Sequence, residues 1–333
     1  MDKGWDFIRR IAEEPFAYYV NWLKEKLPAK SCIGLNPFLF LASEVDIIRA
    51  RVMFKEMTVK FLDEDLVDKL WKDKPPASKA PVIVHDVKYS GESTVEKLNT
   101  IREIIENKRC DSALIYALDQ IAWILNLRGS DIKFNPYFMS YLIITLDEGK
   151  PTVTLYSDID KFKNEKVQNY LKDNNVKLVP YESIAEDAAK LEGRRVAVEL
   201  ALVNAKISSI LKNKASEMVD LGEEIALLKV KKNETQLKGF RACHIRDGAG
   251  LVKCLAWLEH QLNVLNRTDL DEYMASEKIL EYRKEQDMFM GLSFHTVSSI
   301  GANGSIYYRP KKGNSAILNK KEIYLLDSGA HYL

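Results

Sequence analysis

Between about residue 80 and residue 230, the hydrophobic positions switch repeatedly between helical and strand spacing. Apolar residues recur at helical intervals in Ser93–Asn107, and the run SALIYAL that follows is a strand candidate. The runs 140–147 (SYLIITLD) and 152–156 (TVTLY) flank an EGKP segment that suits a hairpin turn. Helix, strand, helix and strand then follow at 160–175, 176–181, 184–193 and 194–200. The pattern predicts an α/β (α+β) fold with helices layered on a sheet.

A shorter segment precedes this stretch. Residues 41–57 have the apolar spacing of a helix, and residues 58–73 predict a short strand that leads into another helix. Lys72–Val82 (KDKPPASKAPV) is rich in proline and polar residues, as are linkers and ordinary surface loops. Interpreted as a linker, it gives three predicted domains, at 1–75, 80–230 and 233–333.

The last hundred residues have the spacing of long helices followed by strands. Residues 233–262 predict one long amphipathic helix, and residues 269–286 a second whose acidic start complements the helix dipole. Strands are predicted in 295–310 and 320–333, on either side of a polar loop. Residues 301–305 (GANGS) are predicted to form a turn between strands, because the lysine and the helix of a phosphate loop do not follow them.

The composition argues against nucleic acids and membranes as partners of the protein. The 333 residues carry 49 basic and 48 acidic side chains, so the chain lacks the basic field that nucleic-acid binding requires. The sequence has no polybasic run for a membrane surface, and Asp119 and Gln120 interrupt its most apolar stretch, which is too short to span a bilayer. Four scattered cysteines without a CxxC pair favour a reduced, cytoplasmic protein.

A carboxylate follows the last apolar run of the sequence, IYLLDSGAHYL. Ile323–Leu326 predict a buried strand that leads into Asp327, and Ser328 and Gly329 predict a turn. A carboxylate at the end of a buried strand requires a partner. Two interpretations remain open. Asp327 is a ligand for a hard divalent cation such as Mn²⁺, or it caps the turn that follows.

Several stretches together resemble one enzyme family. Residues 117–145 (ALDQIAWILNLRGSDIKFNPYFMSYLIIT) are similar to the middle-domain signature of the three-domain Xaa-Pro aminopeptidases. Residues 240–259 (FRACHIRDGAGLVKCLAWLE) are similar to the first helix of that family's catalytic domain, and 66–75 (LVDKLWKDKP) to its first domain junction. The segments 292–310 (LSFHTVSSIGANGSIYYRP) and 323–333 resemble the strands that lead to its first metal ligand.

The resemblance implies creatinase/prolidase-like N-terminal domains followed by the beginning of a pita-bread metallopeptidase domain. It implies hydrolysis of the bond between an N-terminal residue and a penultimate proline in small peptides, with two Mn²⁺ ions as cofactors. Asp327 matches the first of the family's five ligands, which are two aspartates, one histidine and two glutamates. Relatives often dimerise through the catalytic domain, so the resemblance also implies a homodimer.

The sequence departs from the family pattern at several positions. The other four ligands would lie beyond Leu333, and the first domain starts late, so we expect a chain truncated at both ends and inactive by itself. Tyr307 occupies the position of a family histidine that helps to hold the substrate, and tyrosine does not readily carry a positive charge. His331 replaces a usual glutamine, and Asp119–Gln120 replaces a usual Asp-Glu pair.

A second hypothesis comes from another functional class. Loss of catalytic constraint would also explain Tyr307 and His331, and the protein would then be a non-catalytic relative that binds peptides or a full-length subunit. Residues 126–131 (NLRGSD) are predicted to form a structural turn or salt bridge, with a role at the active-site entrance as the alternative. The five histidines are predicted not to be metal ligands: His85, His244, His260, His295 and His331.

Overall fold

The computed structural model describes residues 17–147, 150–306 and 308–333. The chain forms two compact units, each assembled from several stretches of sequence. The first unit contains the chain up to Lys79, and the second ends at Leu333. The remaining stretches are Leu98–Ile121 and Met139–Leu228 in the first unit, and Ala80–Lys97, Ala122–Phe138 and Lys229–Leu333 in the second. The limits 1–75, 80–230 and 233–333 remain a prediction.

Three helices begin in one unit and end in the other. They are α5 (Thr94–Asn107), α6 (Leu118–Ile124) and α10 (Glu224–Val230). Leu98, Ile101 and Ile105 are buried at helical spacing along α5, which explains why this helix could be predicted from the sequence. Along the described ranges, no helix is both long enough and apolar enough to cross a bilayer.

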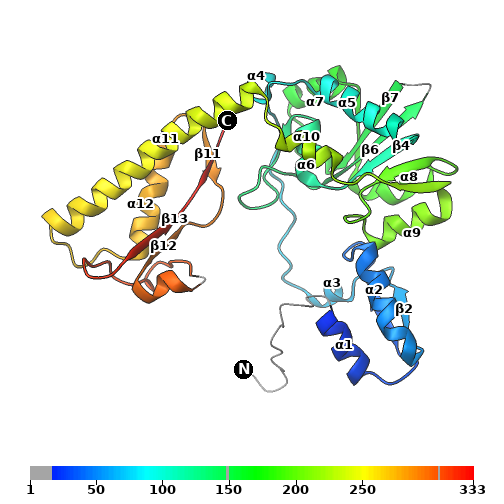
Figure 1. Cartoon of the computed structure of the whole chain (residues 1–333), viewed down its shortest axis with the longest axis horizontal. Helices are drawn as coiled ribbons and strands as arrows, with labels where there is room; N and C mark the ends of the chain where they lie inside the picture. The colour runs from blue at the N-terminus through cyan, green and yellow to red at the C-terminus, as the bar shows by residue number, and fades with distance from the viewer. Residues whose placement is uncertain (1–16, 148–149, 307) are drawn as a thin grey trace. The chain divides into compact units, whose positions relative to one another are not determined.

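A mixed six-stranded sheet forms the centre of the first unit (Figure 1). Its strand order is β10-β9-β4-β6-β7-β8. The strands are β4 (Ser112–Ile115), β6 (Ser140–Asp147), β7 (Lys150–Ser157), β8 (Val176–Pro180), β9 (Arg195–Val198) and β10 (Glu217–Asp220). The predicted hairpin is confirmed, because β6 and β7 pair antiparallel with Asp147 opposite Lys150. Strands β4, β9 and β10 run parallel to one another.

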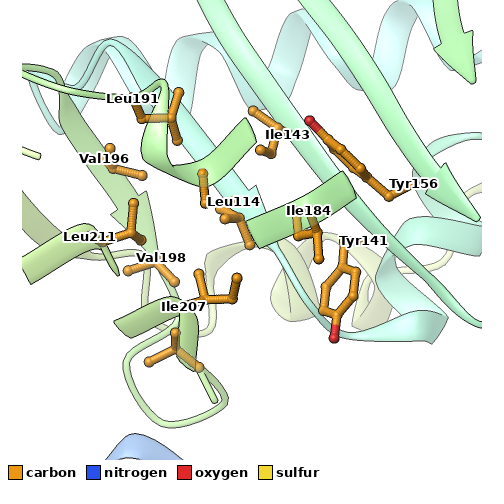
Figure 2. Packing of buried hydrophobic residues seen from close by; sticks show 12 residues of the cluster. Leu114, Tyr141, Ile143, Tyr156, Ile184, Leu191, Val196, Val198, Ile207 and Leu211 are labelled. Atoms are coloured by element: carbon orange, nitrogen blue, oxygen red, sulfur yellow. The ribbon is translucent and has the colours of Figure 1, made fainter. Parts of the chain in front are cut away.

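Two helices, α8 (Ile184–Ala189) and α9 (Ala205–Lys214), contribute to a hydrophobic cluster on this sheet. Leu114 and Ile143 from the strands pack with Ile184 and Ile207 from the helices (Figure 2). Burying an aliphatic side chain of this size contributes about 1.5–3 kcal/mol. Helix α7 (Glu165–Asp173) connects β7 to β8, and short 3₁₀ turns lie at Ile159–Phe162 and Tyr181–Ser183.

The segment before the predicted linker forms a small layer of its own within the first unit. Strands β1 (Cys32–Leu35) and β2 (Thr58–Phe61) pair parallel. Val45, Ile48 and Val52 are buried on one face of helix α2 (Ala42–Val52) and pack in a cluster with Ile33 and Leu35 of β1. The helices are α1 (Ala17–Lys26), α2 (Ala42–Val52) and α3 (Leu66–Leu70), with a 3₁₀ turn at Met53–Lys55.

In the second unit, the long helix α11 (Glu234–Glu259) lies beside α12 (Glu272–Lys284), as Figure 1 shows. The predicted long helix is confirmed. Asn233 caps it by accepting a hydrogen bond from the Gln236 backbone N–H, and a π-helical turn at His260–Val264 follows. The other elements are β3 (Ile83–Val84), α4 (Val87–Ser90), β5 (Leu127–Arg128), β11 (Phe289–Leu292), β12 (Val297–Ile300), β13 (Tyr324–Asp327) and β14 (Ala330–Tyr332).

One prediction for this unit was wrong. Residues 301–305, expected to be a simple turn, form a 3₁₀ helix that directly follows β12. Gly301 has a φ of 55°, a left-handed conformation that glycine adopts without steric cost. The strand predicted over 295–310 therefore covers only Val297–Ile300.

A buried lysine lies in the first turn of α5. The Lys97 side chain is 1% exposed, and its ammonium donates hydrogen bonds to Trp123 O (2.8 Å) and Asn126 Oδ1 (2.7 Å). The ammonium also lies 4.3 Å from the centre of the Trp123 ring. Burial lowers the pKa of Lys97 to about 8, with Glu92 opposing this shift and Arg128 adding to it.

Because of Lys97, the free energy of unfolding should depend on pH in the alkaline range. Between its folded pKa of about 8 and its unfolded pKa of about 10.4, the unfolded chain binds more protons, so the free energy of unfolding rises with pH. We expect Lys97→Met to lose this rise when urea unfolding is measured from pH 7 to pH 10. The exposed Lys88→Met is the control and should follow the wild type. A Lys97→Met profile parallel to the wild type would contradict the prediction.

Candidate metal-binding strand

Strand β13 places Asp327 at its carboxyl end. It pairs antiparallel with β12, so that Asp327 lies opposite Val297 and Tyr324 lies opposite Ile300. Tyr324 and Leu326 pack on the hydrophobic cluster that α11 and α12 form, which directs the alternate residues Leu325 and Asp327 to the other face. Asp327 is exposed there. The expectation of a carboxylate on a buried strand was therefore wrong.

The Asp327 carboxylate has no hydrogen-bond or ion-pair partner among the residues that the structure describes. A cap on the following turn would require a hydrogen bond to that carboxylate, and none is formed within the described ranges. Among the residues that the structure describes, no three side chains of histidine, cysteine, aspartate or glutamate gather there in a group that could hold a metal ion. The described residues alone therefore do not fit a metal ion. Tyr307, the other predicted site residue, lies outside the described residues.

The glycine of the DSGA motif allows a close approach. A Cβ atom on Gly329 would lie 2.5 Å from Ser293 Oγ and 3.0 Å from Phe294 Cε1, closer than these atoms can pack. The Gly329 carbonyl accepts a 3.0 Å hydrogen bond from the Ser293 backbone N–H. Gly329 therefore allows this close approach without displacing the Ser293 and Phe294 side chains.

A buried glutamate, Glu272, organises the neighbouring backbone. It is the first residue of α12, is completely buried, and accepts hydrogen bonds from the backbone N–H groups of Ile300 (2.7 Å) and Ala316 (2.9 Å). The Tyr308 hydroxyl donates a third hydrogen bond at 2.6 Å, and the Asn303 amide donates a further one at 3.1 Å. Burial acts to raise the pKa of Glu272, but these hydrogen bonds outweigh it and lower the pKa. Glu272 thus fixes the end of β12 and the loop before β13.

A second buried charge fixes the strand that follows Asp327. Arg283 on α12 is 1% exposed and donates two hydrogen bonds to the Asp247 carboxylate on α11, at 2.8 and 2.9 Å. The Tyr332 hydroxyl on β14 donates to the same carboxylate at 3.0 Å. Burial raises the pKa of Tyr332 to about 12, and its hydrogen bond to Asp247 adds to this shift. The network therefore joins both helices to β14.

Two histidines contact a single loop residue. His331 on β14 donates from Nε2 to Phe134 O at 2.7 Å, and the His295 ring packs edge-on against the Phe134 ring with centroids 4.5 Å apart. Lys133 Nζ lies 3.5 Å from His295 Nε2. The residue that replaces the usual glutamine therefore binds a backbone carbonyl in this structure. Phe134 itself has a φ of 67°, an uncommon conformation for an aromatic residue.

The NLRGSD segment has mainly backbone partners. Arg128 is mostly buried, and its guanidinium donates to the carbonyl oxygens of Ala122 (3.0 Å) and Leu127 (2.8 Å). A Cβ atom on Gly129 would lie 2.6 Å from Phe138 Cβ, so this glycine also permits a close approach. Burial, together with the charges of Arg128 and Lys97, lowers the pKa of His85 to about 4. These contacts favour the structural interpretation of the segment.

The sequence matches two known domain families and a set of named relatives. Residues 73–236 match the creatinase/prolidase N-terminal domain, and residues 238–333 match metallopeptidase family M24. Along its whole length the chain is 38% identical to the probable Xaa-Pro aminopeptidase P of Aspergillus niger and 40% identical to that of Aspergillus fumigatus. The chain belongs to the Xaa-Pro aminopeptidase family. The family assignment predicted from the sequence motifs is confirmed.

A solved structure of an Xaa-Pro aminopeptidase has the same fold. The X-prolyl aminopeptidase of Caenorhabditis elegans, described as a cytosolic enzyme with a di-nuclear active site, is 30% identical and matches 94% of this chain with a TM-score of 0.85. This match confirms the mixed α/β fold with creatinase-like and M24 parts. The chain spans about half the length of these family members: 55% of the A. niger protein, and 51% of both the A. fumigatus and C. elegans proteins.

The sequence of this Xaa-Pro aminopeptidase family member did not reveal the buried polar residues that position β12 and the loop before β13. Glu272 was interpreted only as an acidic residue that complements the start of a helix. Its hydrogen-bond partners lie between 28 and 44 residues away along the chain, beyond the range of local patterns. The available signal was the Asp271–Glu272 pair, since one acidic residue suffices to cap a helix and Asp271 accepts the capping bond from Met274 N at 2.7 Å.

Proposed function

We propose that the native protein is a metal-dependent Xaa-Pro aminopeptidase and that Asp327 supplies one of its metal ligands. The observation that carries this proposal is the whole-length similarity to probable Xaa-Pro aminopeptidases P, at 38% and 40% identity, combined with the DSGA motif on β13. An exposed carboxylate that has no partner among the described residues, on a strand paired with β12, whose end Glu272 fixes, is available to a cation.

The chemical class of the substrate and of the metal follows from the same family. We propose cleavage of the bond before a penultimate proline in small peptides, with Mn²⁺ as the metal and the cytoplasm as the location. Carboxylate oxygens suit Mn²⁺, and the described part of the chain contributes Asp327 as its candidate ligand. The remaining ligands of a di-nuclear site must then come from residues other than those described, because the described residues form no group that could hold a metal ion.

The test compares the native protein with the 333-residue chain. Native protein purified from its source is characterised by intact mass and terminal peptides, and release of the N-terminal residue from an Arg-Pro-Pro peptide is measured with and without added Mn²⁺. We expect turnover by the native protein and none by the 333-residue chain. No turnover by the native protein would overturn the proposed function. Metal-dependent turnover by the 333-residue chain would overturn the claim that further ligands are needed.

A further inference from the structure

The carboxyl ends of three parallel strands bring acidic residues together in the first unit. Val198 of β9 pairs with Leu114 of β4 and with Asp220 of β10, so the three strands end at one edge of the sheet. Glu199 directly follows β9, and Gln120 lies in α6, just after β4. Ligand sites of α/β sheets form at such an edge, so its polar groups need an explanation.

Gln120 and Glu199 form a buried pair at this edge. Gln120 is 4% exposed and Glu199 is 6% exposed, and the Gln120 amide donates a 2.7 Å hydrogen bond from Nε2 to Glu199 Oε1. The other polar atom at the end of each side chain, Gln120 Oε1 and Glu199 Oε2, is also buried and finds no partner within the described residues. Each such unsatisfied atom costs about 1–3 kcal/mol. Both atoms are acceptors if Glu199 is ionised, so neither can satisfy the other.

The surrounding charges are acidic. Asp119 on α6, Asp220 on β10 and Glu223 before α10 all act on Glu199, and the Asp220 carboxylate already accepts hydrogen bonds from the backbone N–H groups of Leu200 and Gly222. Burial, assisted by these three carboxylates, raises the pKa of Glu199 against the opposing effect of the Gln120 hydrogen bond. A metal ion is not the explanation, because no metal-holding group of three such side chains occurs within the described residues.

We propose that Glu199 is protonated in the folded protein at pH values where an exposed glutamate is ionised, and that its Oε2–H donates to Gln120 Oε1. The proton comes from solvent, and no other bond is made or broken. Together with the hydrogen bond from Gln120 Nε2–H to Glu199 Oε1, this bond closes a ring. Each polar atom at the end of the two side chains then has a partner. A proton thus joins α6 to the end of β9, and the joint weakens as pH rises.

The sign of the pH dependence follows from proton linkage. Because the folded state holds this proton more tightly than the unfolded state, the free energy of unfolding should fall as pH rises from the ordinary glutamate pKa of about 4.3 through the folded pKa. The Glu199→Gln variant keeps the shape and can form the same ring between two amides without a titrating group. Its stability should match that of the wild type at about pH 4 and exceed it increasingly as pH rises through the folded pKa of Glu199.

Thermal and urea unfolding of the 333-residue chain from pH 4 to pH 8 tests this proposal. The matched control is Glu103→Gln, an exposed glutamate on α5, which should follow the wild-type profile. If the Glu199→Gln and wild-type profiles run parallel, or if the wild type gains relative stability with pH, the proposal is overturned.

A spectroscopic measurement on the wild type does not depend on how any variant folds. In protein labelled with ¹³C at the glutamate carboxyl carbon, the Glu199 resonance should change from the chemical shift of a carboxylic acid to that of a carboxylate at a higher pH than the resonances of the exposed glutamates do. The resonance is assigned by its absence from Glu199→Gln, or by selective labelling if that variant does not fold. A Glu199 resonance that titrates at the same pH as the exposed glutamates, or at a lower pH, would overturn the proposal.

Discussion

Replacing Asp327 by asparagine is expected to abolish metal-dependent hydrolysis of Xaa-Pro peptides by the native protein, with kcat/KM falling at least about 100-fold. The amide keeps the size of the side chain but removes the negative charge that a hard divalent cation prefers. Changing a residue that only supports a metal ligand typically lowers metal affinity or activity 10–100-fold. Changing a ligand itself should therefore lower activity by more than that. The measurement is the rate of N-terminal residue release at saturating Mn²⁺.

A stability measurement separates a role in metal binding from a structural role. Because Asp327 is exposed and without a partner among the described residues, Asp327→Asn should change the free energy of unfolding by less than about 0.5 kcal/mol. The exposed Asp287→Asn, in the turn between α12 and β11, is the matched control and should retain activity. An Asp327→Asn protein that retains wild-type activity would exclude the carboxylate as a ligand.

Replacing Glu272 by alanine is expected to destabilise the 333-residue chain by about 4 kcal/mol. The change leaves the Ile300 and Ala316 N–H groups and the Tyr308 hydroxyl without their acceptor, and each buried unsatisfied group costs about 1–3 kcal/mol. It also opens a cavity beside β12. Urea unfolding of the purified chain gives the difference in free energy.

Two further glutamate variants test the cause. Glu272→Gln retains the side-chain volume and one acceptor oxygen, so its free energy of unfolding should fall by less than that of the alanine variant. Glu277→Ala, at an exposed position on the same helix, should change stability by less than about 0.5 kcal/mol. If Glu272→Ala and Glu277→Ala are equally stable, the hydrogen bonds of Glu272 do not hold β12 in place.

Acid should have the opposite effect on Glu272 from its effect on Glu199. The folded pKa of Glu272 is lowered, so its contribution is present above the unfolded pKa and is lost as pH falls through the folded pKa. The Glu272→Gln variant should therefore lose less stability than the wild type between about pH 5 and pH 3. The same titration series used for Glu199→Gln provides this comparison.

Elements with a strong local pattern could be predicted from the sequence. Strand β6 spans the predicted residues 140–147, and α5 begins one residue after its predicted start. Their apolar periodicity coincides with what is buried, since β6 lies inside the sheet and α5 presents a regular apolar face. The strand predicted over 295–310 was too long because its glycine-containing half adopts 3₁₀ geometry after Ile300.

The position of Asp327 on a strand followed from its apolar neighbours, but its exposure did not. The residues 323–326 are all apolar, so the sequence offers no alternation from which to choose the inward face. Packing on α11 and α12 makes that choice, by selecting Tyr324 and Leu326 for the cluster. The partners of Glu199 and Glu272 are likewise set by tertiary contacts, and Gln120 lies 79 residues from the glutamate that it contacts.

The hydrogen bond between Phe134 and His331 has a consequence for synthesis on the ribosome. The two residues are 197 positions apart in the sequence, and both belong to the second unit. At about 5–20 residues per second, the loop around Phe134 would leave the ribosome roughly 10–40 seconds before its partner strand exists. During that interval the Phe134 carbonyl lacks its native hydrogen-bond donor, and the Phe134 ring lacks the His295 ring until residue 295 has been made.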